Sequence, residues 1–294
     1  MGAFSIRISI CLFTMLFISA VALAEEPIGV TVSISPEKYF AEKIGGARIS
    51  VTVMVPPGAD AHVYEPKPKQ LIALARSKLY FGIGLPFERA WLRRFKTANP
   101  HLRFVFTDER ITKIPMKYQE YHSGEARHER GEGLDPHVWL SPRLVKTIAL
   151  SMYEALAEAD PVHRLEYAAN CRAFNAEVDT LDASLKSVFA CAKGHPRFMV
   201  FHPAWGYFAD AYGLEQIPIE IEGREPKPSE LIQLMKTAKA LNITVIFVQP
   251  QVSARSAKAI ADAVGGRTVY ADPLAENWAA NLRTVAEKFY TALR

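Results

Sequence analysis

The chain has 294 residues and a formal net charge of +4, from 35 lysines and arginines against 31 aspartates and glutamates. This mild charge, without a clustered basic stretch, argues against a nucleic-acid-binding protein, because that function needs a concentrated positive surface. The length suits two lobes better than one compact core.

The first residues have the pattern of a secretory signal peptide. Arg7 precedes a nearly continuous apolar run over residues 8–23, and Ala22-Leu23-Ala24 resembles a cleavage site with small residues. We therefore predict a signal peptide over residues 1–24, cleavage after Ala24 and an exported mature protein. An uncleaved membrane anchor is the alternative, but the run is short for a stable span.

The first half of the remaining chain alternates strand and helix patterns. We expect strands at 28–35, 49–57, 78–84 and 102–108, and helices at 36–46, 66–77 and 87–100. Such alternation indicates parallel βαβ units. The polar stretch 117–133 lacks an apolar face, so it is predicted to be a mobile loop.

Two helices follow, at 142–158 and 161–190. In the second, apolar residues recur at helical spacing, at Cys171, Phe174, Val178, Leu181, Leu185 and Val188. A helix of this length would extend about 45 Å. It is either a long core helix of one domain or a rigid strut between two lobes, and the new βαβ units that follow it favour the strut.

The cysteines of the exported chain, Cys171 and Cys191, would lie in an oxidising compartment. Cys171 falls within the long helix and Cys191 just after its end. Twenty helical residues span about 30 Å, so we predict no disulfide between them.

The second half repeats the plan of the first. We expect strands at 198–203, 214–223, 244–251 and 267–273, and helices at 204–213, 227–242, 253–266 and 277–293, with Ser229 as an N-cap. The predicted fold class is α/β, with two βα lobes of mainly parallel sheets. The N-terminal lobe would comprise residues 25–160, the linking helix 161–190 and the C-terminal lobe 191–294.

Four side chains stand where predicted strands end, namely His62, His137, His202 and Asp272. Each has an ordinary alternative, since a lone loop histidine is commonly a surface residue and Asp-Pro is commonly a turn. Ligands of open α/β sheets bind beyond the carboxyl ends of strands. Three imidazoles and one carboxylate fit a closed tetrahedral zinc site, whereas manganese and calcium prefer more oxygen ligands.

Several stretches together resemble the cluster A-I, zinc-type family of ABC-transporter substrate-binding proteins, which capture zinc or manganese outside the inner membrane. They are PPGADAHVYEPKP, DPHVWLSP, VFHPAWGYFADAYGL, EIEGREPKPSEL and YADPL. The resemblance implies two lobes joined by one long rigid helix, with a metal ion held between them by the same four residues; His202 at the third position favours Zn²⁺. It also implies a periplasmic monomer that docks on an inner-membrane ABC permease and catalyses no reaction. Ala61 departs from the family pattern, which usually has proline before the first ligand.

The roles of four further polar residues have two interpretations each. His122 and His128 in the 117–133 loop belong either to a solvated linker or to a weak accessory zinc site. Glu222 and Arg224 would either face the cleft or pair at the surface.

The rival functions are a manganese or iron carrier of the same class, a zinc hydrolase with Asp272 as its base, and an adhesin acting through surface residues. His202 favours zinc, because manganese-binding relatives commonly have glutamate at that position.

Overall fold

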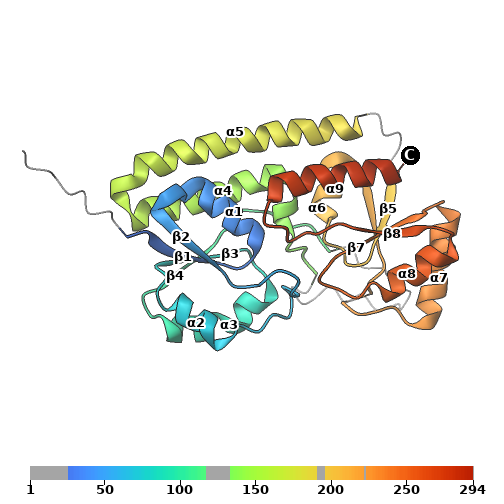
Figure 1. Ribbon diagram of the computed structural model, residues 1–294, viewed down its shortest axis with the longest axis horizontal. Coiled ribbons are helices and arrows are strands. Elements are labelled where there is room, and N and C mark those ends of the chain that lie inside the picture. The colour runs from blue at the N-terminus through green and yellow to red at the C-terminus, as the bar shows by residue number, and fades with distance from the viewer. Residues whose placement is uncertain (1–25, 117–132, 191–195, 222, 294) are drawn as a thin grey trace, which may run out of the picture.

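The computed structural model describes residues 26–116, 133–190, 196–221 and 223–293. In these ranges the chain forms two four-stranded sheets that lie side by side (Figure 1). The first contains β1 (Ile28–Val32), β2 (Ile49–Val53), β3 (Leu79–Gly82) and β4 (Arg103–Phe106). The second contains β5 (Arg197–Val200), β6 (Glu215–Pro218), β7 (Val245–Val248) and β8 (Arg267–Tyr270). The predicted α/β fold is confirmed.

Some sequence-based predictions fall outside these ranges. They concern the signal peptide, the loop histidines His122 and His128, the cysteine Cys191 and the acid Glu222. The lobe boundaries at residues 160 and 190 stay a prediction.

The two sheets share one topology. Their strand orders are β2-β1-β3-β4 and β6-β5-β7-β8, and every neighbouring pair is parallel. The predicted repetition is therefore confirmed. Strands β3 and β7 are buried along their whole length, as expected for parallel strands covered on both faces. In each sheet the order reverses beside β1 or β5, which is where open α/β sheets place ligands.

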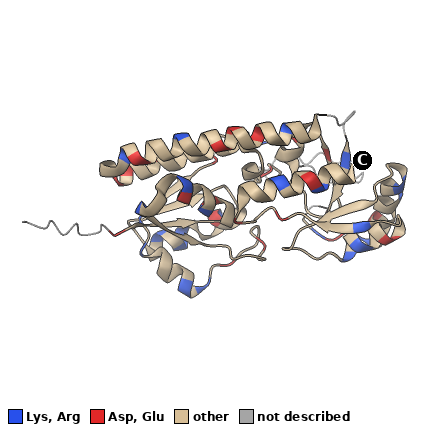
Figure 2. Ribbon diagram, turned by 45° about the horizontal axis from the view of Figure 1, so that its top comes forward, with Lys and Arg blue, Asp and Glu red and all other residues tan. Residues whose placement is uncertain are grey.

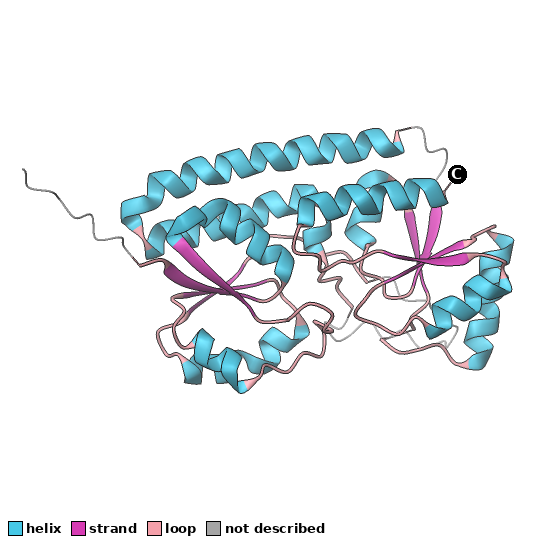
Figure 3. Ribbon diagram, viewed as in Figure 1, coloured by secondary structure: helices cyan, strands magenta, loops and turns pink. Residues whose placement is uncertain are grey.

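Helices cover both faces of each sheet (Figure 3). They are α1 (Ser35–Gly45), α2 (Pro68–Leu74), α3 (Pro86–Ala98), α4 (Pro142–Ala159), α5 (Arg164–Phe189), α6 (Gly206–Tyr212), α7 (Pro228–Ala240), α8 (Arg255–Ala263) and α9 (Trp278–Ala292). Helices α2 and α3 lie below the first sheet in Figure 1, and α7 and α8 lie below the second.

Helix α7 corrects one prediction. It begins at Pro228, so Ser229 lies inside the helix and is not its N-cap. The carboxylate of Glu230 accepts the backbone N–H of Lys227 at 2.6 Å. A proline at the first position followed by a glutamate that reaches back therefore starts this helix in place of the serine.

Helix α5 has 26 residues and spans both halves of the molecule (Figure 1). It packs against α4 and α1 of the first half and against α9 and α6 of the second. The predicted apolar stripe is buried from Cys171 to Leu185, with Val188 partly buried, and Cys171 is a free thiol. One apolar core runs from Val30 of β1 to Phe289 of α9. The helix is thus a link between the sheets and also part of a shared core.

Along α5, lysine and arginine are interspersed with aspartate and glutamate, whereas the exposed charged residues of α3 are all basic, at Arg89, Arg93, Arg94 and Lys96 (Figure 2). Within the part of the chain that the structure describes, every helix is too short or too polar to span a bilayer.

Candidate metal centre

Three imidazoles meet between the two sheets. The Nε2 atom of His62 lies 3.3 Å from that of His137 and 3.1 Å from that of His202, and the last two are 3.3 Å apart. Zinc–imidazole bonds of about 2.0–2.1 Å in a tetrahedron place the nitrogens about 3.3 Å from one another. The three nitrogens therefore already have the spacing of three corners of a zinc site.

The local structures that carry these histidines differ from one another. His202 follows the end of β5, as predicted, and His62 lies farther along the loop after β2. The prediction that His137 ends a strand is wrong, because β4 ends at Phe106 and His137 instead begins the 3-10 helix Val138–Leu140. The expected local structure was incorrect, but the structure brings the His137 ring nitrogen to the other two imidazoles.

His202 is fixed by side chains from two other strand ends. Its Nδ1 lies 2.8 Å from Oε2 of Glu220, beyond β6. Gln249, beyond β7, accepts the His202 backbone N–H at 3.2 Å and donates to its carbonyl at 2.7 Å. When Nδ1 donates to the carboxylate, the Nε2 lone pair is directed at the other two imidazoles, which is the tautomer a metal needs.

His137 is fixed mainly by Asp135. One oxygen, Oδ1, accepts both the backbone N–H of His137 at 2.9 Å and its ring Nδ1 at 2.7 Å. Tyr207 of α6 donates its hydroxyl to the Asp135 carbonyl at 2.9 Å. A side chain at Gly206 would place Cβ 2.5 Å from Asp135 Oδ2, so this approach of the two halves requires glycine.

His62 is held by a shorter-range contact. Its backbone N–H donates to Asp60 Oδ1 at 2.8 Å, within the same loop. Ala61 between them is buried. The described residues provide no hydrogen-bond acceptor for Nδ1 of His62, so its ring is oriented chiefly by the other imidazoles.

Burial keeps two of the imidazoles neutral. Together with the neighbouring His137 and His202 rings, it lowers the pKa of His62 to about 3. Burial also lowers the pKa of His137 well below its usual value, and His202 and Lys113 add to this effect. Only a neutral imidazole can coordinate a metal, so the fold keeps these two candidate ligands in the form that coordination requires.

Replacing His62 by glutamine should make the metal-free protein relatively more stable in acid. As the pH falls below 6.5, the unfolded chain protonates this histidine while the folded state, with its lowered pKa, does not. The wild type should therefore lose about 1.4 kcal/mol of stability relative to the variant at about pH 5.5. Urea unfolding of both proteins at about pH 7.5 and pH 5.5 measures this difference, and parallel pH profiles would contradict it.

Asp272, the fourth predicted ligand, is not brought to the imidazoles. Within the described residues, the group of three or more potential ligands whose ligand atoms all lie within 4.8 Å of one another consists of the three histidines, without Asp272. Asp272 Oδ1 instead accepts hydrogen bonds from Gln251 Nε2 at 2.7 Å and from the Leu274 backbone N–H at 2.9 Å. Its role as a ligand stays a prediction that requires its side chain to turn.

A cavity of about 440 Å³ contains the three imidazoles. Both halves of the chain line it, with Trp139 on one side and Gln251 and Arg224 on the other. The Arg224 guanidinium forms a double hydrogen bond with Glu230, at 2.9 Å for each contact. Arg224 therefore agrees with both predictions made from the sequence, because it borders the cavity and is also paired with an acidic residue.

Sequence reasoning missed the carboxylates behind the histidines. The contact of Asp135 with His137 could have been predicted, since Asp135 stands two residues before His137 in the sequence. Glu220 was not, because its contact with His202 joins the ends of two different strands.

A family model and solved structures of known proteins indicate the same family for this chain. The model described as "ZnuA: Zinc-uptake complex component A periplasmic" matches residues 30–292. A solved structure titled as a crystal structure of ZnuA is 43% identical, with a TM-score of 0.85, and the match covers 92% of this chain and all of that one. A ZnuA deletion mutant with zinc bound is also 43% identical, with a TM-score of 0.83 over 91% of this chain and 98% of its own.

Curated relatives are more distant and differ in their metal. The high-affinity zinc uptake system protein ZnuA of Bacillus subtilis is 26% identical over 244 residues, or 81% of this chain and 76% of the relative. The manganese-binding lipoprotein MntA of Halalkalibacterium halodurans is 28% identical over 215 residues, or 72% of this chain and 67% of the relative.

Proposed function

Because the chain belongs to the family of the periplasmic zinc-uptake complex component A, we propose that it captures Zn²⁺ in the periplasm and delivers it to an inner-membrane ABC importer. The observation that carries the proposal is the spacing of the three Nε2 atoms, 3.1–3.3 Å apart. When all three Nε2 atoms are unprotonated, their lone pairs repel, and a cation at their centre removes that repulsion. The proposed ligands are His62, His137 and His202, with Asp272 as the fourth.

The donor set supports zinc over manganese or iron(II). Imidazole is a borderline ligand that suits zinc, whereas manganese prefers sites rich in oxygen. His202 supplies a nitrogen where a manganese carrier is expected to supply a carboxylate. The carboxylates that border the imidazoles, Asp135 and Glu220, bond the Nδ1 atoms and support the ligands from behind.

We propose a carrier without catalytic activity. A zinc hydrolase needs a general base beside a metal-bound water. Asp135 and Glu220 already accept hydrogen bonds from the histidines, and Asp272 is bonded to Gln251. The signal peptide over residues 1–24, export to the periplasm and docking on a permease belong to the same proposal.

Metal-stripped protein should bind one Zn²⁺ tightly, and manganese should fail to displace it. We expect a zinc preference of at least about a hundredfold, since a site with three imidazoles disfavours manganese in the metal affinity series. Titration with each metal against a chelator of known affinity, at neutral pH, measures both constants. Tighter binding of manganese would retain the importer role and overturn the assignment of the ion.

A further inference from the structure

Gln251 connects the candidate metal cavity to Asp272. It lines the cavity that contains the three imidazoles, and its Nε2 donates to Asp272 Oδ1 at 2.7 Å. The same carboxylate oxygen accepts the Leu274 backbone N–H at 2.9 Å. Two donors thus hold one oxygen of Asp272, the member of the predicted four-residue site that stands away from the three imidazoles.

The backbone around Asp272 is held independently of Gln251. Asn281 donates to the Asp272 carbonyl at 2.7 Å, and the Trp139 indole donates to the Pro273 carbonyl at 2.8 Å. Moving this loop would break both contacts. Rotation of the Asp272 side chain breaks neither, so the carboxylate can leave Gln251 and turn while the loop stays in place.

The hydrogen bond from Gln251 to Asp272 makes only a small net contribution to the free energy. A hydrogen bond to a charged carboxylate is stabilising. The other amide atom, Gln251 Oε1, is buried and has no hydrogen-bond partner in the described part of the chain. An unpaired buried carbonyl costs free energy of a size similar to what such a bond contributes. A contact with these opposing contributions can open and close without a large change in free energy.

We propose that Gln251 is a positioning residue that keeps Asp272 off the metal in the empty carrier and takes it back during release. The inference rests on the proposed zinc-carrier function. On loading, the three imidazoles bind the ion and Asp272 turns from Gln251 to the fourth position. When Asp272 returns to Gln251, the ion keeps three neutral ligands and dissociates more easily. Gln251 therefore lowers the affinity and speeds the release.

Replacing Gln251 by leucine should raise the zinc affinity about tenfold, because Asp272 no longer has to leave a charge-assisted hydrogen bond. The gain should appear mainly as slower dissociation, measured by stopped-flow transfer of zinc to an excess of chelator. Gln251→Ala should change the affinity and the dissociation rate in the same direction, which would exclude an effect specific to leucine. In an Asp272→Asn background, Gln251→Leu should change neither constant. Gln233→Leu, on the exposed face of α7, is the matched control and should also leave both unchanged.

The possible outcomes distinguish a failure of the Gln251 proposal from a failure of the proposed zinc-carrier function. If the wild type binds zinc tightly but Gln251→Leu is unchanged or weaker, the holding role is wrong and the carrier stands. An effect of Gln251→Leu that persists with Asp272→Asn also overturns the role. A crystal structure of the zinc-loaded wild type that retains the Gln251–Asp272 bond, with Asp272 off the ion, does so as well. If the wild type binds no zinc, both proposals fall.

Discussion

Replacing His202 by alanine should weaken zinc binding by about 10²–10³-fold. Zinc sites with four protein ligands contribute about 10–16 kcal/mol, so one ligand accounts for about 2.5–4 kcal/mol. The variant also leaves Glu220, which is 7% exposed, without the ring nitrogen that it contacts at 2.8 Å. Competition with a fluorescent zinc chelator at neutral pH measures the change.

His101 offers the matched control for this variant. It is an exposed histidine away from the cavity, so His101→Ala should bind zinc as the wild type does. Circular dichroism of both variants checks that the fold is kept. An unchanged affinity in a folded His202→Ala protein would make His202 a structural residue and remove the central support for the carrier.

Much of the fold was predictable because its signals are local. Apolar runs bounded by glycine and proline indicated all eight strands, and helical periodicity indicated α5. The ends were less predictable. Strand β6 was expected to reach residue 223 but ends at Pro218. Backbone hydrogen bonds from Ile219 and Glu220 still reach the Phe201 carbonyl, but the partner chain then turns at His202 and Pro203, whereas the alternation in the sequence continues.

The site was predictable only in part. His62, His137 and His202 were found from their loops, and the structure brings their nitrogens together. Asp272 was grouped with them on the same grounds, yet Gln251 holds it elsewhere. Strand ends indicate which loops share an edge of a sheet, but the direction of a side chain depends on hydrogen bonds between residues far apart in sequence. Such contacts produce no periodic pattern in the sequence.

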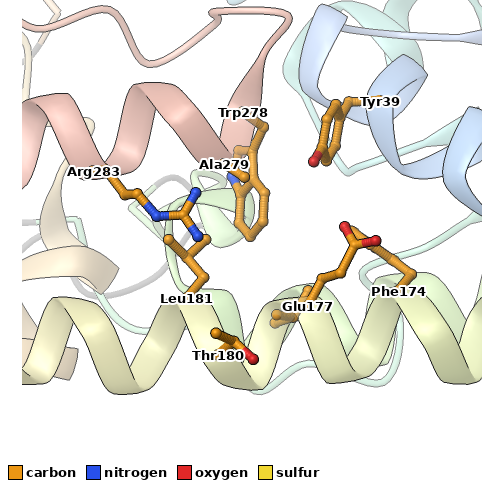
Figure 4. A pocket seen from close by; sticks show the side chains of 9 residues that line it. Tyr39, Phe174, Glu177, Thr180, Leu181, Trp278, Ala279 and Arg283 are labelled. Atoms are coloured by element: carbon orange, nitrogen blue, oxygen red, sulfur yellow. The ribbon is translucent and has the colours of Figure 1, made fainter.

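Replacing Trp278 by alanine should destabilise the protein by about 3–5 kcal/mol, the usual cost of removing a large buried aromatic ring. Trp278 begins α9, is 1% exposed, and packs edge-on against Phe40 of α1 with ring centroids 5.0 Å apart. It lies with Tyr39 of α1 above Leu181 and Phe174 of α5 (Figure 4). Urea unfolding of the metal-free protein measures the loss.

Trp278→Phe separates packing from hydrogen bonding at this junction. The indole N–H donates to the Trp139 carbonyl at 2.7 Å, and the Trp139 ring packs on His137 at 5.1 Å between centroids. Phenylalanine keeps most of the ring, so it should cost about 1–2 kcal/mol, chiefly from the lost bond and the unpaired carbonyl. If Trp278→Ala instead cost less than about 1 kcal/mol, or unfolding occurred in two separate steps, the two halves would not share the single core that joins them beneath α5.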